Sequence, residues 1–360
     1  MMVRRGRFGV RVKYFKTNNQ QSAKRAERLG MKRFLTTAAA AVVAISTATA
    51  ADIKPAVVFD MGGKFDKSFN EGIYNGVERF SNESGIKYGE FEVTNEAQRE
   101  QALRNFARRG YSPVIAVGFA QGPALDKVAS EYPDTKFSII DMVVDRPNVQ
   151  SIVFKEHEGS FLVGMLAALA SDTGKVGFVG GMDIPLIRKF ACGYEQGVKH
   201  VNPGADVYQN MTGTTPAAWN DPVKGGELAK SQFDRGADVV YAAAGGTGLG
   251  VLQAAADSGK LSIGVDSNQN YLHPGSVLTS MLKRVDVAAY DVYKSSMDGT
   301  WQPGIKVLGL AEDGVGWALD DNNKSLISAD MQAKVEAAKA DIIAGKISVH
   351  DYMADNSCSY

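Results

Sequence analysis

Short apolar segments that alternate with helix-like segments constrain the fold of this chain more than any other feature. Such an alternation is typical of a parallel sheet whose strands are joined by right-handed helical crossovers. In the first half the predicted strands are 54–60, 87–93, 113–118 and 137–141, and the predicted helices are 69–84, 96–110 and 121–131.

The same alternation begins again after residue 155, with a helix predicted from Gly159 to Ser171. The strands that follow are predicted at 175–180, 205–210, 238–243, 261–265 and 276–281, and the helices at 184–201, 222–235, 247–258, 284–298 and 329–344. A chain of this length exceeds what one core usually serves. We therefore predict an α/β fold of two similar, doubly wound, Rossmann-like lobes with parallel sheets, joined by several short crossings.

The N-terminal segment has the pattern of an export signal. Met31-Lys32-Arg33 precedes an apolar, alanine-rich run from Phe34 to Ala50, which ends in an A-x-A sequence. This pattern predicts a secretory (Sec) signal peptide over 31–50 with cleavage after Ala50, and residues 1–30 are interpreted as a start codon assigned too early. The apolar run is shorter than the ~20 residues that a membrane-spanning helix needs. No cysteine follows the cleavage site, so we expect a periplasmic protein without its own membrane anchor.

Removal of residues 1–50 makes the chain acidic. This segment holds 11 of the 40 lysines and arginines and 1 of the 40 acids, which leaves 29 basic against 39 acidic residues and a net charge of −10. An acidic chain has no positive field to attract nucleic acid or anionic membrane, so neither is expected as a partner.

The cysteines and histidines argue against a metal or a cofactor. Cys192 and Cys358 are the two cysteines, and their spacing leaves open whether they pair. The histidines are scattered without ligand spacing. No dinucleotide fingerprint is present, because Val251 stands where the third glycine would follow Gly246 and Gly248. The sequence also has no P-loop motif.

The loop after the first strand carries the strongest candidate site. Asp60 closes the strand, and Ser68 with Glu71 is predicted to form a capping box that leaves backbone N–H groups at the helix start free for a polar ligand. Phe69 is available to stack on a planar ligand, and Asn70 adds an amide. The alternative is an ordinary capped loop with solvated charges.

Further candidates follow other strands, at the edge where open α/β sheets bind ligands. Asp141 ends its strand as Asp60 does, and both are predicted to face one crevice, although a strand-end aspartate is often only a turn former. Gly245 and Gly246 allow a close approach of backbone to a small ligand.

A charge pair is predicted from the next two strands. Asp266 and Lys283 are expected to face each other and to bind vicinal hydroxyls, with a structural salt bridge as the alternative. Trp219 precedes a helix and lies opposite Phe69 if the lobes face each other; the alternative is packing under its own loop.

Taken together, these motifs resemble a known family. The segments that carry the resemblance are Phe59-Asp60-Met61-Gly62-Gly63 with Asp66-Lys67-Ser68-Phe69-Asn70, then Val179 to Pro185, Gly264 to Gln269, and Leu278 to Lys283. Their order and spacing resemble the basic membrane protein (BMP) family of ABC-transporter solute-binding proteins over essentially the whole mature chain.

The resemblance implies a type I periplasmic binding protein, in which a three-segment hinge joins two lobes that close on a purine nucleoside for delivery to an inner-membrane ABC permease. It places the base between Phe69 and Trp219, the base-edge and nearby polar contacts at Asp60, Asn70 and Asp141, the ribose at Asp266 and Lys283, and a backbone approach to the sugar at Gly245 or Gly246. The implied lobes are 51–155 with about 284–303, and 156–283 with about 304–360.

One departure leaves the ligand open. Trp219 stands in Ala218-Trp219-Asn220-Asp221-Pro222, where many relatives have phenylalanine. A free purine base or another planar metabolite is the alternative ligand, and a ligand-presenting sensor subunit is the alternative role. A periplasmic nucleoside hydrolase that uses Asp60 or Asp66 as its base is disfavoured, because no catalytic triad is legible. We therefore expect a binding protein and not an enzyme.

Overall fold

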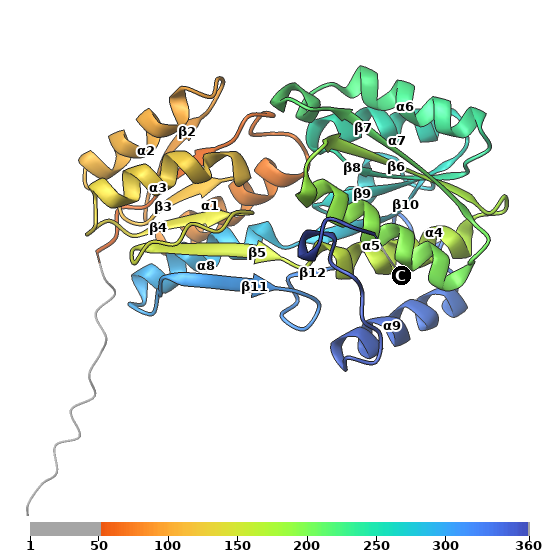
Figure 1. The fold of residues 1–360 in the computed structure, drawn as a ribbon. Coiled ribbons are helices and arrows are strands. Elements are labelled where there is room, and N and C mark those ends of the chain that lie inside the picture. The colour runs from red at the N-terminus through yellow and green to blue at the C-terminus, as the bar shows by residue number, and fades with distance from the viewer. Residues whose placement is uncertain (1–51, 359–360) are drawn as a thin grey trace, which may run out of the picture. The chain divides into compact units, whose positions relative to one another are not determined.

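The structure is a computed structural model that describes residues 52–358. The predicted signal peptide over 31–50 and the residues before it lie outside this range. Two sheets organise the described residues, which confirms the predicted α/β class (Figure 1).

The first lobe is built on a sheet with the strand order β11-β5-β4-β3-β1-β2. All of its paired strands run parallel. Its strands are β1 (Ala56–Phe59), β2 (Gly89–Glu92), β3 (Val114–Val117), β4 (Phe137–Ile140), β5 (Val149–Phe154) and β11 (Gly304–Leu308), and its helices are α1 (Phe69–Ser84), α2 (Gln98–Arg108), α3 (Gly122–Glu131) and α8 (Val285–Met297).

The second lobe is built on a sheet with the order β12-β10-β9-β8-β6-β7. It departs from the predicted parallel arrangement at one edge, where β12 runs antiparallel to β10. Its strands are β6 (Lys175–Met182), β7 (Asp206–Gly213), β8 (Val239–Ala243), β9 (Leu261–Asp266), β10 (Val277–Lys283) and β12 (Val315–Trp317), and its helices are α4 (Glu156–Ala170), α5 (Pro185–Val201), α6 (Pro222–Asp234), α7 (Gly248–Asp257) and α9 (Ala329–Ile343).

Helices cover both faces of each sheet because successive strand residues point to opposite faces. In β1, Val57 and Phe59 pack into one hydrophobic cluster, whereas Ala56 and Val58 pack into another on the opposite side. Within each lobe the first five strands have the doubly wound order 2-1-3-4-5. Folds of this order bind ligands outside the carboxyl ends of the strands.

The chain passes between the two sheets three times, from β5 to α4, from β10 to α8, and from β11 to β12. The crossings lie together, since the Lys155 backbone N–H donates to Leu308 and that of Arg284 donates to Gly314. The first sheet continues past the predicted boundary near residue 303, because β11 pairs with β5 (Figure 1). Sequence patterning missed β11 because Ile305 and Val307 lie exposed on this edge strand.

Cys192 of α5 and Cys358 form a disulfide, with their Cα atoms 5.5 Å apart. This settles the question that cysteine spacing left open. The bond ties the segment that follows α9 back onto α5.

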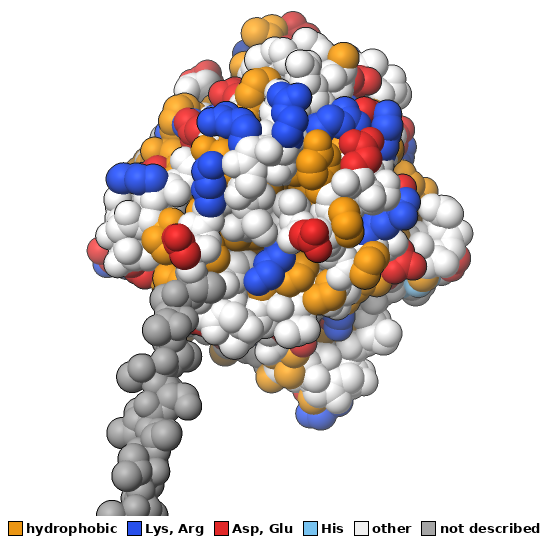
Figure 2. Space-filling view, turned by 90° about the vertical axis from the view of Figure 1, so that its left-hand side faces the viewer, with side chains coloured by type: hydrophobic (Ala, Val, Ile, Leu, Met, Phe, Trp, Pro, Cys, Tyr) orange, Lys and Arg blue, Asp and Glu red, His pale blue; other side chains and the backbone are white. Residues whose placement is uncertain are grey.

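The described surface carries mixed charge on the side shown in Figure 2, where lysine and arginine side chains lie among acidic and hydrophobic ones. No helix within residues 52–358 is both long enough and apolar enough to cross a membrane.

Candidate ligand-binding site

A cavity lies between the two lobes. Its walls come from the carboxyl ends of β1, β3 and β4 of the first sheet and of β6, β7, β8, β9 and β10 of the second, with the segments that follow them. The walls include eight of the nine residues predicted from sequence: Asp60, Phe69, Asn70, Asp141, Trp219, Gly245, Asp266 and Lys283.

Gly246 is the predicted residue that does not line the cavity. It is buried behind the wall, where a Cβ atom at this position would lie 3.2 Å from the Trp219 carbonyl oxygen and 3.8 Å from the Cβ atom of Asp66. Gly246 therefore permits close packing against the Trp219 backbone within the second lobe.

Two strand-end aspartates hold unusual backbone conformations. Asp141 has φ 71° and Asp266 has φ 62°, in the left-handed region that non-glycine residues seldom adopt. Such strained residues cluster at functional sites. Burial raises the pKa of both carboxyl groups to about 6, against the opposing effect of the Lys283 ammonium.

Asp60 is held by a partner that the sequence analysis did not identify. A terminal guanidinium nitrogen of Arg99 donates to Asp60 Oδ1 at 3.2 Å, and both side chains are buried. Burial raises the pKa of Asp60, while Arg99 acts in the opposite direction. A signal was present in the sequence, because Arg99 shares helical spacing with the apolar Ala102, Leu103 and Phe106 on the buried face of α2.

Gly118, at the end of β3, gives the Asp60 carboxylate its space. It has φ 90°, and a Cβ atom there would lie 2.7 Å from Asp60 Oδ2. Only glycine fits this position without displacing the carboxylate.

The predicted capping box at the start of α1 was wrong. The Ser68 side chain makes no cap hydrogen bond. Asp66 caps the helix instead, and its carboxylate accepts from the backbone N–H groups of Ser68, Asn70 and Glu71 at 2.8, 3.0 and 3.1 Å. These N–H groups are therefore satisfied by the protein and are not free for a ligand. Burial raises the pKa of Asp66 to about 6.

Two buried oxygen atoms in the cavity walls have no hydrogen-bond partner among the described residues. They are Asn70 Oδ1 and Asp141 Oδ1. Buried polar atoms are nearly always hydrogen-bonded in folded proteins. Both atoms accept hydrogen bonds, so the cavity suits a ligand that carries several N–H or O–H donors.

The charge partners of Lys283 differ from the prediction. Its ammonium pairs with Asp141 Oδ2 at 2.6 Å and with Glu156 Oε1 at 3.0 Å, and not with Asp266. Asp266 instead accepts a hydrogen bond from the Ser68 hydroxyl at 2.5 Å. Glu156 was not predicted, because it stands at a crossing between the lobes, where no periodic pattern marks it. Burial opposes charging of Lys283, but the surrounding carboxylates raise its pKa overall.

Phe69 and Trp219 bring an aromatic ring from each lobe to the cavity, as expected from the sequence. Trp219 ends a 3₁₀ turn (Pro216–Trp219) before α6. Its ring lies on Gly181, where a Cβ atom would be 2.3 Å from Cζ3. Its own Cβ atom faces Gly62 of the first lobe, where a Cβ atom would lie 3.3 Å from it. The tryptophan therefore packs against a surface cleared by two glycines, and not only under its own loop.

Hydrogen bonds bridge the lobes beside the cavity. Besides the bond from Ser68 to Asp266, the Ser267 hydroxyl donates to the Ser68 carbonyl oxygen at 3.0 Å. The Gln269 amide donates to the Lys67 carbonyl oxygen at 3.0 Å. These contacts hold the two walls of the cavity together.

The described residues contain no group of three or more histidine, cysteine, aspartate or glutamate side chains placed to hold a metal ion. What the site offers is four aromatic rings, from Phe69, Phe119, Phe190 and Trp219, together with buried carboxylates and the Lys283 ammonium, a set of groups for binding a small polar molecule with a flat face.

Comparison with known proteins agrees with this geometry. The sequence profile of the Bmp family, described as ABC transporter substrate-binding protein PnrA-like, matches residues 53–352. An uncharacterized lipoprotein of Pyrococcus horikoshii is 38% identical, over 74% of this chain and 69% of its own length. The ABC transporter nucleoside-binding protein BmpA of Lactococcus lactis is 32% identical, over 83% of this chain and 89% of its own length.

A solved structure supports the same assignment. The crystal structure of an ABC transporter solute-binding protein from Aeropyrum pernix shares 32% of its sequence, covers 82% of this chain and 92% of its own, and superposes with a TM-score of 0.75. This chain therefore belongs to the Bmp family of ABC transporter substrate-binding proteins.

Proposed function

We propose that this protein captures a purine nucleoside, namely adenosine, guanosine or inosine, between its two lobes and delivers it to the permease of an ABC transporter. The observation that carries the proposal is the composition of the cavity wall. Two rings from opposite lobes accompany two buried oxygen atoms that have no partner among the described residues. A nucleoside combines a planar base for the rings with N–H and O–H donors for the oxygens.

The polar groups of the cavity wall indicate where the base and the ribose of the ligand would bind. Asp60 and Asn70 would accept from the edge of the base, because Asp60 is oriented by Arg99 and Asn70 Oδ1 is unpaired among the described side chains. Asp266 and Lys283 would hold the ribose hydroxyls, with Gly245 leaving room for the sugar beside the backbone.

The Lys283 ammonium has a donor to spare. It carries three N–H groups; one donates to Asp141 Oδ2, and a second is counted for the ion pair with Glu156. The third would donate to a ribose hydroxyl.

Relatives support the ligand class, since the Lactococcus lactis protein is named as nucleoside-binding.

Export is part of the proposal, in which the chain acts in the periplasm after cleavage behind Ala50. Mass spectrometry of the protein recovered from the periplasm tests this point. A mature N-terminus at Ala51 is expected, and a retained or lipid-modified N-terminus would contradict it.

Calorimetric titration of residues 51–360 with nucleosides, free purine bases and ribose tests the ligand. We expect a dissociation constant of about 1 μM or less for at least one nucleoside, equivalent to about −8 kcal/mol. Ribose should bind far more weakly, because it lacks the stacked base. Tighter binding of a free base than of any nucleoside would replace the proposed ligand with the base, and hydrolysis of the glycosidic bond would indicate an enzyme.

A further inference from the structure

A buried chain of charges runs from the ligand cavity to the C-terminal end of the described structure. Lys283 pairs with Glu156 at 3.0 Å, and the other carboxylate oxygen of Glu156 pairs with Lys189 of α5 at 3.0 Å. Lys189 in turn pairs with Asp351 Oδ2 at 3.4 Å. Side-chain exposure is 1% for Glu156 and 8% for Lys189, so the links nearest the ligand are shielded from solvent.

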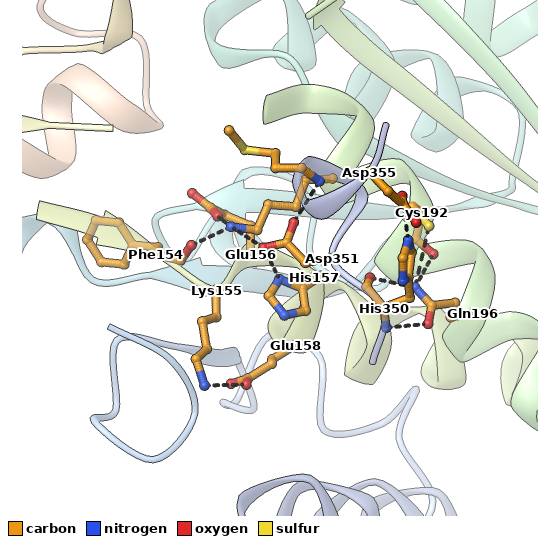
Figure 3. A network of polar contacts seen from close by, with 12 residues as sticks. Phe154, Lys155, Glu156, His157, Glu158, Cys192, Gln196, His350, Asp351 and Asp355 are labelled. Carbon is orange, nitrogen blue, oxygen red and sulfur yellow. Dashed lines mark hydrogen bonds and ion pairs between the residues drawn. The ribbon is translucent and has the colours of Figure 1, made fainter. Parts of the chain in front are cut away.

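Asp351 lies in the segment 349–358, here called the C-terminal strap. Three residues of α5 hold this strap: Lys189 contacts Asp351, Cys192 forms the disulfide, and Gln196 exchanges two hydrogen bonds with the His350 backbone at 2.7 and 3.0 Å. Positions 189, 192 and 196 lie on one helical face, being three and four residues apart. Figure 3 shows Asp351 beside Glu156 and His157, and His350 against Gln196 near Cys192.

The two carboxylate oxygens of Asp351 make different contacts. Oδ1 accepts from the Met353 backbone N–H at 2.9 Å and fixes the side chain, while Oδ2 faces Lys189. The Lys189 ammonium also donates to the Phe154 carbonyl oxygen at 2.7 Å. The ammonium thus combines one hydrogen bond with two ion pairs, to Glu156 and Asp351.

This arrangement matters at the cavity because Glu156 is shared by two ammonium groups. Burial penalises its charge, yet Lys283 and Lys189 lower its pKa and keep it ionised. If Lys189 lost an acceptor, it would shift within its buried site and Glu156 would follow. Lys283, which forms an ion pair with Glu156, would then lose its fixed position at the ligand.

We propose that Asp351 and Lys189 are positioning residues for the ligand site, and that the disulfide-tied strap sets ligand affinity by holding Lys283 through Glu156. This inference rests on the proposed function, because it assigns to Lys283 the contact with the ribose hydroxyls. It extends the binding site to a segment that follows α9 and contributes no residue to the cavity wall.

Asp351→Asn tests the proposal with little disturbance, because the amide oxygen of asparagine can still accept from Met353. The control is Asp321→Asn, which removes an equal charge from a side chain that is 93% exposed. We expect Asp351→Asn to raise the dissociation constant of the best-bound nucleoside about 2- to 30-fold, the range found for mutations within coupled networks. Asp321→Asn should leave it unchanged.

The 2′,3′-dideoxy form of the same nucleoside distinguishes a loss of Lys283 positioning from a general disturbance of the binding site. Because it lacks the hydroxyls assigned to Lys283, Asp351→Asn should weaken its binding much less. An equal loss for both ligands, or no loss for either, would overturn the proposal. Cys192→Ser/Cys358→Ser should act in the same direction and add little to Asp351→Asn, because both changes release the same strap.

A measurement without ligand keeps the inference separate from the proposed function. Lys283 is 2% exposed in its side chain, so its amine should be methylated slowly by formaldehyde and borohydride in the wild-type protein. Asp351→Asn and the double serine variant should speed this labelling, as read by mass spectrometry. Unchanged labelling of Lys283 would contradict the inference even if nucleosides bind, and faster labelling would support it even if none do.

Discussion

Replacing Ser68 with alanine removes a hydrogen bond that joins the two lobes beside the ligand. The Ser68 hydroxyl is buried and donates to Asp266 Oδ2 at 2.5 Å. Hydrogen bonds to charged groups contribute about 1.5–3 kcal/mol. In an open form both side chains would reach water, so this loss falls on the closed form alone. At 1.4 kcal/mol for each factor of ten, the dissociation constant of the nucleoside should rise about 10- to 150-fold.

Calorimetry and stopped-flow fluorescence are the assays for Ser68→Ala. Most of the loss should appear as faster dissociation, because the bond forms only after the lobes meet. The bond from Ser68 also lowers the pKa of Asp266, whose burial raises it. The variant should therefore lose affinity at a higher pH than the wild type when the pH is lowered from 8 to 6, as Asp266 becomes protonated.

Ser130→Ala is the matched control, because its hydroxyl donates only to the Lys127 carbonyl oxygen within α3, among the described contacts. An affinity of Ser68→Ala within twofold of both the wild type and this control would refute the reasoning. It would mean that the interlobe bond contributes nothing to the bound state.

Three further changes probe the site and the fold. Phe69→Ala should weaken nucleoside binding by about 1–3 kcal/mol, the range for a base stacked on an aromatic side chain, as measured by calorimetry. Gly181→Ala would place a Cβ atom 2.3 Å from Trp219 Cζ3, so the ring must move and the affinity should fall while the chain stays folded by circular dichroism. Burial raises the pKa of Asp66 from 3.8 to about 6. The free energy of unfolding, measured in urea, should therefore fall as the pH rises from 4 to 6.5. Asp66→Asn should remove about 2–3 kcal/mol of that pH dependence.

Each of these changes has a control or a contrary outcome. Phe65→Ala alters a phenylalanine on the same loop that is 59% exposed, and it should bind nucleoside as the wild type does. Gly316→Ala adds a Cβ atom with nothing within 4 Å and should be silent. Equal affinities for Phe69→Ala and Phe65→Ala would remove Phe69 from the site. An unchanged pH slope in Asp66→Asn would show that this carboxyl does not titrate between pH 4 and 6.

Local patterning was enough to predict most of the fold. The alternation of apolar strands with amphipathic helices located β1, α1 and α5 closely, because β1 is a continuous apolar run and the buried residues of α1 and α5 recur with the helical period of 3.6. It did not locate β11, whose stability comes from its ladder with β5 and whose side chains largely face solvent. The helix at α4 began earlier than predicted, at Glu156, because burial on all sides leaves no periodicity to mark its start.

The site was predictable where chemistry follows a strand end and not where it depends on tertiary contact. Asp60, Asp141 and Asp266 each close a strand, and parallel topology brings such ends to one edge. The ion pairs could not be read in the same way. Lys283 meets Glu156 because two crossings of the chain lie together, and no pattern in the sequence records that proximity.

A crystal structure of residues 51–360 with the best-bound nucleoside tests the central claim most directly. We expect the base between the rings of Phe69 and Trp219 and a ribose hydroxyl within hydrogen-bond distance of Lys283 Nζ. We also expect Asn70 Oδ1 and Asp141 Oδ1 to accept hydrogen bonds from the ligand, directly or through water. A nucleoside bound outside this cavity, or one whose base touches neither ring, would contradict it.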